Sequence, residues 1–161
     1  MKVRTEFGLA RTECACPHCT QFCLFMPGFL VPSDLERMVP AGADPLAWAE
    51  TNLLASPGAL VMQGRHLFRI PTLVPAVRAD GSCINFDGAC TIHAIAPFGC
   101  AFPSCSDPPE FEAAAAEALR TILCEHSDHA TLYARVWNHL WDIGRRQLPP
   151  EELRKRERTQ P

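Results

Sequence analysis

The sequence predicts a small α+β domain, with a loop-rich, metal-stapled body that holds a short β-hairpin and flanking helices, and with two longer helices at the C-terminal end. Three observations support this prediction. The 161 residues suit one domain with its own core. Nine cysteines, fifteen prolines and nine glycines indicate many turns and a role for thiol chemistry. Helical patterns then fill the last third, so we expect a cysteine-bearing body over 10–106, a helical part over 107–148 and a polar tail over 149–161.

The composition excludes several classes of function. A net charge of −3 creates no broad positive field for nucleic acid or anionic lipid. The apolar runs are too short or too interrupted to cross a bilayer, and the start "MKVRTEFGLARTECAC" lacks the apolar stretch of a secretory signal. We therefore expect a cytoplasmic protein without a membrane or nucleic-acid partner. The sequence also contains no G-x-G-x-x-G, P-loop or G-x-S-x-G motif, so neither nucleotide nor hydrolase chemistry is indicated.

Two short helices are expected after the first cysteines. In "MPGFLVPSDLERMVP", Ser33 is the predicted N-cap, Glu36 stands at the capping-box position, and Pro40 ends the segment. A second helix is predicted to begin at Asp44-Pro45, because a capping residue precedes proline at the first helical position. We expect it to run until Pro57-Gly58.

Strands are expected in the middle of the chain. Residues 59–78 are rich in β-branched and aromatic side chains but are interrupted by proline and glycine, which predicts short or edge strands. Asp87-Gly88 then predicts a type I′ hairpin turn, in which both central residues have positive φ. That turn would pair Phe86 with Ala89, Asn85 with Cys90 and Cys83 with Ile92. Cys83 and Cys90 would then be diagonal neighbours on one face, roughly 7 Å apart at Cβ.

Two longer helices are predicted at the C-terminal end. "DPPEFEAAAAEALRTILCEH" starts with Asp107 as an N-cap, prolines in the first turn and a long alanine-rich run. In "SDHATLYARVWNHLWDIGRR", Tyr133, Trp137 and Trp141 recur every four residues and are expected to face the core rather than a cofactor. Gly144 is the predicted C-terminal stop.

Eight of the nine cysteines fall into two groups. "CACPHCTQFC" has the spacing C-x-C-x2-C-x3-C, and short gaps of this kind let a loop wrap its sulfurs around one centre. Because cytosolic thiols stay reduced, so dense a pattern indicates metal binding or catalysis rather than disulfides. The spacing leaves open two four-sulfur sites or one site that draws on both groups. The candidate ligands are Cys14, Cys16, Cys19, Cys23, Cys83, Cys90, Cys100 and Cys105.

A thiol redox site is an alternative interpretation of the first group. Cys16-Pro17-His18-Cys19 has the spacing of a dithiol couple, which acts as an oxidant when it opens a helix. Such a site normally follows a β-strand directly, whereas "KVRTEFGLARTE" is a poor strand. Extra thiols at Cys14 and Cys23 would also compete for wrong disulfides. The metal interpretation uses more of the pattern and is preferred.

The cysteine pattern resembles the zinc- or iron-chelating cysteine-cluster family, also called YkgJ-like. The resemblance lies in "CACPHCTQFC" leading into "PGFLVPSDLERM", and in "GSCINFDGACTIHAIAPFGCAFP", so it covers roughly residues 14–105. It implies chelation of zinc or an iron–sulfur cluster, and related clusters look similar to the iron–sulfur part of flagellin lysine methylases. The sequence departs from the family in the wider spacing of Cys19 and Cys23 and in Ala96 before Pro97. Carried over by residue, the resemblance supports every candidate ligand except Cys105, which rests on spacing alone.

The histidines and Cys124 are weaker candidates for metal ligands. On the expected hairpin register, His93 faces away from Cys90 unless the strand ends first, which favours a structural or supporting role. His18 is slightly weaker still as a ligand. Cys124 lies among apolar residues of the alanine-rich segment and is expected to be a small hydrophobic residue of a core helix. The other histidines, His66, His126, His129 and His139, are expected to be surface or packing residues.

The sequence thus predicts a metal-binding protein that holds a 4Fe-4S iron–sulfur cluster or zinc through cysteines, with a redox or carrier role and another protein as partner. A cubane accepts thiols spread more widely than one zinc ion does, so iron–sulfur is slightly preferred. One alternative is an iron–sulfur-dependent enzyme that transfers methyl groups or electrons. The other is the cytosolic thiol-disulfide oxidoreductase. No side chain is offered as a catalytic residue, because the acidic candidates are explained by caps and turns.

Overall fold

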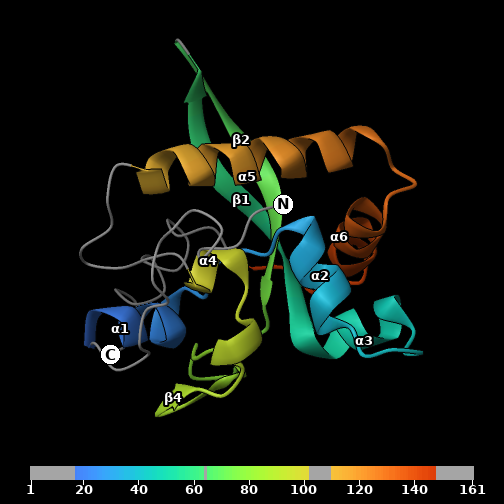
Figure 1. Ribbon diagram of the computed structural model, residues 1–161. Helices are drawn as coiled ribbons and strands as arrows, with labels where there is room; N and C mark the ends of the chain where they lie inside the picture. Colours follow the sequence, from blue (N-terminus) through green and yellow to red (C-terminus); the bar gives the residue numbers. More distant parts are fainter. Residues whose placement is uncertain (1–16, 64, 102–109, 148–161) are drawn as a thin grey trace, which may run out of the picture.

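The structure is a computed structural model that describes residues 17–63, 65–101 and 110–147. Its centre is an antiparallel hairpin of β1 (Leu53–Gln63) and β2 (His66–Pro75). Helix α5 (Glu110–Ser127) lies across this hairpin and α6 (Leu132–Asp142) packs beside its base, while the far end of the hairpin projects beyond the body (Figure 1). The predicted α+β class is confirmed.

Smaller elements surround the base of the hairpin. Elements α1, α4 and β4 gather at the lower left of Figure 1, and α2 and α3 at the lower right. None of the described helices is long and apolar enough to cross a membrane. The smaller elements are α1 (Pro17–Phe25), α2 (Pro32–Met38), α3 (Pro45–Asn52), β3 (Phe86–Asp87), β4 (Ala89–Cys90), the 3-10 helix η2 (His93–Ile95) and α4 (Phe98–Ala101).

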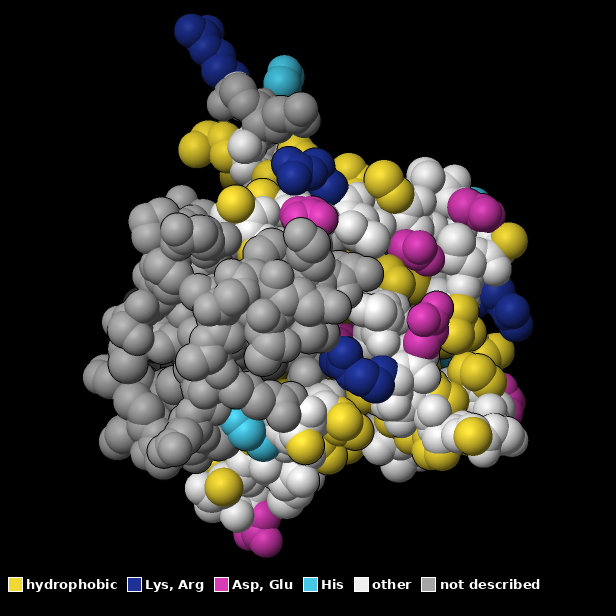
Figure 2. All heavy atoms as spheres, viewed as in Figure 1, with side chains coloured by type: hydrophobic (Ala, Val, Ile, Leu, Met, Phe, Trp, Pro, Cys, Tyr) yellow, Lys and Arg dark blue, Asp and Glu magenta, His cyan; other side chains and the backbone are white. Residues whose placement is uncertain are grey.

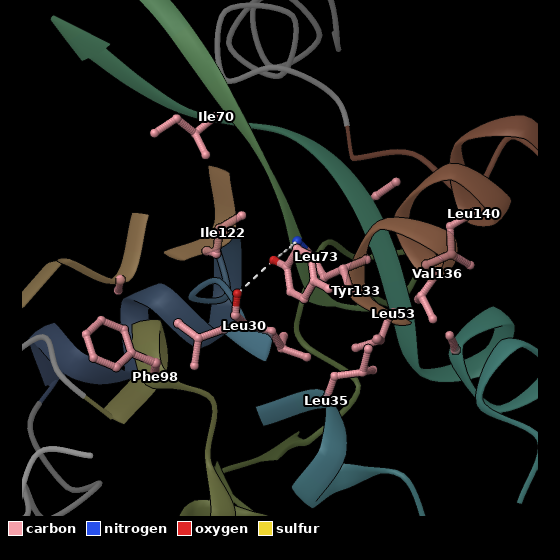
Figure 3. Close-up of a cluster of buried hydrophobic side chains, with 14 of the residues drawn as sticks. Leu30, Leu35, Leu53, Ile70, Leu73, Phe98, Ile122, Tyr133, Val136 and Leu140 are labelled. Carbon is pink, nitrogen blue, oxygen red and sulfur yellow. Dashed lines mark hydrogen bonds between the residues drawn. The ribbon is translucent and has the colours of Figure 1, made fainter. Parts of the chain in front are cut away.

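One hydrophobic core joins the hairpin to the helices. Tyr133 of α6 lies at its centre, fully buried (Figure 3). Trp137 and Trp141 pack against the core, with their rings stacked at 4.8 Å, so the prediction that this aromatic stripe faces the core is confirmed. The labelled neighbours of Tyr133 in Figure 3 are Leu30, Leu35, Leu53, Ile70, Leu73, Phe98, Ile122, Val136 and Leu140.

The two short helices were predicted at nearly the right places. The prediction of Ser33 as N-cap is wrong: α2 starts at Pro32, after Val31, and the Asp34 carboxylate accepts a hydrogen bond from the Val31 N–H at 2.9 Å. For α3 the cap is confirmed, since Asp44 accepts from the Leu46 N–H at 3.1 Å. Helix α3 ends at Asn52, however, and does not continue to Pro57.

The end of α3 was predicted wrongly because Leu53 begins a strand. Pairing with β2 buries Leu53, Leu54 and Ala55, and this long-range pairing outweighs their helix propensity. Pro57 and Gly58 form an irregularity within β1 rather than a helix stop, because the register with β2 shifts between Ser56 and Ala59. Residues 59–78 therefore contribute to one long hairpin instead of several short strands.

The small hairpin forms, but its predicted register is wrong. Phe86 pairs with Cys90 and Asp87 with Ala89, one residue away from the expected pairing. Only Gly88 of the turn has positive φ, at +70°, so the turn is not type I′, which needs two such residues. Cys83 pairs instead with Val77 in an isolated bridge. The predicted diagonal contact of Cys83 with Cys90 across this hairpin therefore loses its basis.

The C-terminal helices follow the prediction with one exception. The proposed cap Asp107 lies outside the described residues, whereas α6 is capped by Thr131, which accepts from the Ala134 N–H at 3.3 Å. Gly144, at φ +80°, follows the end of α6 as expected. The prediction that Cys124 packs in the core is wrong, because α5 turns this thiol to solvent.

Charged side chains are dispersed over the described part of the face in Figure 2. On the described part of the face in Figure 2, arginine side chains and acidic side chains are interspersed among apolar and neutral groups. This distribution agrees with the small net charge of the sequence.

Candidate metal centre

Four of the eight candidate ligands have described side chains, and each comes from a different segment. Cys23 is in α1, Cys83 precedes β3, Cys90 ends β4 and Cys100 is in α4. Cys19 lies one helical turn before Cys23, and only its backbone is described. The first group was expected to form a loop, but residues 17–25 are helical. The remaining candidates Cys14, Cys16 and Cys105 lie outside the described residues.

Three of the described thiols lie near the fourth, that of Cys100. Burial raises the pKa of the Cys100 thiol far above its usual range. Negative charge on Cys83, Cys23 and Cys90 raises this pKa further, and such an effect requires the three sulfurs to lie nearby. In addition, the Cys83 N–H donates to the Cys23 carbonyl at 2.7 Å, which ties the two cysteine groups together directly. The fold therefore brings Cys23 of the first group beside three members of the second.

A close approach of two glycines positions Cys100. The Gly99 N–H donates to the Phe29 carbonyl at 2.9 Å, and the Gly28 N–H donates to Cys100 Sγ at 3.2 Å. A Cβ on Gly28 would lie 2.1 Å from the Gly99 carbonyl carbon and 2.4 Å from the Cys100 nitrogen. Only glycine permits this approach, and the Gly28 N–H favours the thiolate form of Cys100.

A buried carboxylate fixes the start of α4, two residues before Cys100. Asp34 Oδ2 accepts from the Phe98 N–H at 2.7 Å and from the Val31 N–H at 2.9 Å, while Oδ1 pairs with Arg37. Burial raises the pKa of Asp34, and these hydrogen bonds together with the Arg37 charge oppose that rise. Asp34 thus caps the start of α2. It also holds the segment with Cys100 against α2.

Cys83 sits in a loop with its own polar support. Burial raises the pKa of this thiol, whereas hydrogen bonds from the backbone and side chain of Asn85 and the charge of Arg78 lower it. The Arg78 guanidinium also donates to the carbonyls of Cys83, Ile84 and Phe86 at 2.7 to 2.8 Å. The hydrogen bonds from Asn85 and the charge of Arg78 therefore favour the thiolate form of Cys83, which burial disfavours.

Sequence patterns did not reveal these supporting residues. Arg78 and Asn85 stand near Cys83 in the chain but match no motif, and Gly28 was part of an ordinary turn. Their roles depend on contacts formed by folding, in particular the contact of Gly28 with α4, 72 residues away. Proximity to Cys83 was the one signal available for Arg78 and Asn85.

The described histidines lie mainly in packing positions. His93 opens η2 beyond the end of β4, so its position does not follow the expected strand. His126 packs edge-on against Tyr133 and Trp137, with its Nε2 3.1 Å from the Pro71 carbonyl oxygen, and burial lowers its pKa. His139 lies 2.7 Å from Glu50. The last two support the expectation of packing and surface histidines.

The donor chemistry fits a thiolate-bound metal centre. Within residues 17–63, 65–101 and 110–147, no three His, Cys, Asp or Glu side chains are already spaced around a single ion. Four thiols nevertheless approach from four segments, and soft sulfur donors suit zinc or iron–sulfur clusters rather than magnesium or calcium. Their hydrogen bonds from backbone N–H groups are of the kind that supports bound thiolates. The type of donor atom therefore agrees with zinc or an iron–sulfur cluster and does not distinguish between them.

Comparison with known proteins provides no relative whose function could be transferred. No protein-family model matches the chain, and neither a curated protein nor a solved structure matches it. The function must therefore follow from the chemistry of the four thiols.

Proposed function

We propose that this protein binds a metal centre through cysteine thiolates, with a 4Fe-4S cluster as the first candidate and zinc as the second. The observation that carries the proposal is that the fold brings the two cysteine groups together: the Cys83 N–H donates to the Cys23 carbonyl at 2.7 Å, and Cys23, Cys83 and Cys90 each act electrostatically on the buried Cys100 thiol. The four thiols belong to four different segments, so no local structure accounts for their closeness. A metal centre that all four thiols bind would account for it. This function is also the one implied by the resemblance to the YkgJ-like family.

The contacts among the described cysteines favour one site with ligands from both cysteine groups. Cys23 contributes from the first group, and Cys83, Cys90 and Cys100 contribute from the second. The other proposed ligands, Cys14, Cys16, Cys19 and Cys105, would complete this site or form another. Cys19 precedes Cys23 by one turn of α1, so the helix carries both toward the same end of the molecule.

The iron–sulfur cluster is preferred because the four thiols come from four separate segments. A zinc ion needs all its sulfurs about 2.3 Å from one point, whereas a cubane takes one thiolate at each of four iron corners and so suits ligands from separate segments. When bound, such a cluster supplies one-electron transfer. The protein would hold it, limit its contact with water and donate hydrogen bonds to its sulfur ligands through Gly28 and Asn85. We also propose a cytosolic location, where thiols stay reduced, and a protein partner that exchanges electrons or metal with this centre.

Anaerobic purification of the untagged protein tests the proposal. Iron, zinc and acid-labile sulfide would be measured together with the visible spectrum, for the wild type, Cys100→Ser and Cys124→Ser. We expect a brown wild-type protein with about four irons and four sulfides per chain, and loss of most of this content in Cys100→Ser. Cys124 is exposed on α5, so its variant is a matched control that should load like the wild type.

Each outcome of this experiment has a distinct meaning. Stoichiometric zinc without colour would replace the cluster by a structural or carrier zinc site. Equal metal loss in both serine variants would point to nonspecific damage instead of a site at Cys100. Wild-type protein without metal, after anaerobic handling and reconstitution, would contradict the proposal.

One observation favours thiol-disulfide exchange as a second candidate. Cys16-Pro17-His18-Cys19 has the spacing of a dithiol couple, and its second cysteine lies in a helix, α1. A disulfide-reduction assay on metal-free protein would test this function. Cys19→Ser should abolish activity and Cys124→Ser should retain it if the candidate is correct.

A further inference from the structure

Arg78 makes an unusual set of contacts for a surface arginine. Its Nη1 atom lies 2.8 Å from the Cys83 carbonyl oxygen, 2.7 Å from the Phe86 carbonyl oxygen and 3.2 Å from Ser82 Oγ. Its Nη2 atom lies 2.8 Å from the Ile84 carbonyl oxygen. One guanidinium therefore ties down the whole loop that carries Cys83.

The backbone of the same loop closes around Arg78. The Arg78 N–H donates to the Ser82 carbonyl at 2.7 Å, and the Gly81 N–H donates to the Arg78 carbonyl at 3.0 Å. Asp80 Oδ1 accepts from the N–H and the hydroxyl of Ser82 at 2.9 and 2.7 Å, which forms the turn before Cys83. None of these contacts uses the Cys83 thiol, so the loop has a shape of its own that does not depend on what the thiol binds.

The charge of Arg78 also acts on the thiol. Cys83 is 5% exposed, so a thiolate there loses most of its hydration. Four thiolates in one site carry a larger negative charge than either metal centre neutralises, and a guanidinium that contacts the Cys83 backbone at 2.8 Å lowers this cost. Arginine suits this role because it stays charged and its planar fork reaches several acceptors at once.

We propose that Arg78 is the positioning residue and counter-charge of the four-thiol centre: it holds the Cys83 loop in its ligand-ready shape and sets how tightly the centre binds its metal. This inference rests on the proposed function. It assigns a determinant of affinity outside the cysteines. Supporting residues of this kind typically change metal affinity about 10- to 100-fold when removed.

Arg78→Gln, Arg78→Lys and Arg135→Gln would be compared with the wild type. Arg135 is an exposed arginine of α6, so its variant removes the same charge away from the Cys83 loop. The readouts are metal retention against a competing chelator, the reduction potential if the centre contains iron, and hydrogen exchange of residues 82–86 in metal-free protein. We expect Arg78→Gln to retain metal at least about tenfold less well. We also expect a lower potential and faster exchange in this loop, with Arg135→Gln like the wild type.

The lysine variant separates charge from positioning. It should restore much of the reduction potential but not the slow exchange, because an ammonium cannot satisfy the same set of acceptors. If Arg78→Gln does not fold, Arg78→Lys decides alone: wild-type retention and exchange in this variant would overturn the proposal. Equal metal retention by wild type and folded Arg78→Gln would overturn it too, while leaving the metal centre intact. A wild type that takes no metal would overturn both proposals.

Discussion

Single buried polar side chains join segments that are far apart in the sequence. The Tyr133 hydroxyl donates to the Leu30 carbonyl and accepts from the Leu73 N–H, both at 2.8 Å (Figure 3). Leu30 and Leu73 also share a backbone hydrogen bond, so the hydroxyl takes the place of the second bond in their bridge. Burial raises the pKa of Tyr133, which keeps it a neutral donor. One side chain thus links α6, β2 and the segment before α2.

Replacing Tyr133 by phenylalanine should therefore destabilise the fold. The ring would still fill the core, but the Leu73 N–H and the Leu30 carbonyl would lose their partner in a buried site. We expect a loss of about 3 kcal/mol in the free energy of unfolding, measured by urea denaturation. Thr121→Val is a suitable control, because the Thr121 hydroxyl only donates to a helix carbonyl at the surface and its removal should change stability by less than about 0.5 kcal/mol. Similar losses in the two variants would contradict this account of the hydroxyl.

Among the elements, the long hairpin depends on one irregular position. Gly58 has φ +90° and lies where the register of β1 and β2 shifts. A Cβ at Gly58 would lie 1.6 Å from the Ile70 carbonyl oxygen, so the two strands approach more closely here than any side chain allows. The bulge lets both parts of β1 pair with β2 although Pro57 interrupts the strand.

Gly58→Ala should weaken the hairpin strongly. The substitution combines a left-handed backbone, which costs about 1 to 2 kcal/mol, with a clash against backbone atoms that cannot move away alone. We expect a total loss of about 3 kcal/mol in the free energy of unfolding. Gly144→Ala is the matched control, because Gly144 has φ +80° but no atom within 4 Å of its added Cβ. It should lose only about 1 kcal/mol, and an equal effect at both positions would show that the close approach at Gly58 does not matter.

The molecule as a whole is built from two unequally stabilised parts. The described core cluster draws its buried side chains from α2, α3, α4, α5, α6, β1 and β2, and from Leu30 and Val31 before α2. Among the described segments that carry candidate thiols, α1, β4 and the loop with Cys83 contribute none of the buried residues of that cluster, whereas α4 contributes Phe98. These segments are held by polar contacts such as those of Arg78 and the Cys83–Cys23 backbone bond, and by Ile84, which packs against a smaller hydrophobic cluster. A metal centre would cross-link this part and add folding free energy to it.

Metal removal should therefore loosen the two parts unequally. Binding to the folded state alone contributes about 4 kcal/mol when free metal exceeds the Kd a thousandfold. We expect chelation to lower the Tm and to speed hydrogen exchange in residues 17–25 and 82–100, while α5, α6 and the β1–β2 hairpin keep their protection. Calorimetry and exchange mass spectrometry on metal-loaded and metal-free protein would measure this. Uniform loss of protection across the chain would mean that the two parts unfold together.

Local chemistry determined much of the fold from the sequence alone. Four local signals were decisive, and each acts within one or two turns of a helix. They are Asp44 before Pro45, the alanine-rich run of α5, the aromatic residues that recur every four positions from Tyr133 in α6, and the stop at Gly144. Such signals do not depend on distant residues, so the α+β class and the positions of α3, α5 and α6 followed from them. The eight candidate thiols were likewise named from spacing, and their ligand role stays a prediction.

Only the tertiary structure decided which of those residues meet. The β3–β4 register depends on the local turn at Gly88, whereas the end of α3 at Asn52 and the exposure of Cys124 depend on partners that are distant in sequence. The same is true of the site, because Cys23 reaches Cys100 only when α1 folds against α4 and Gly28 contacts Gly99 at backbone distance. Sequence spacing carries no information about such contacts, since they depend on the packing of the whole chain.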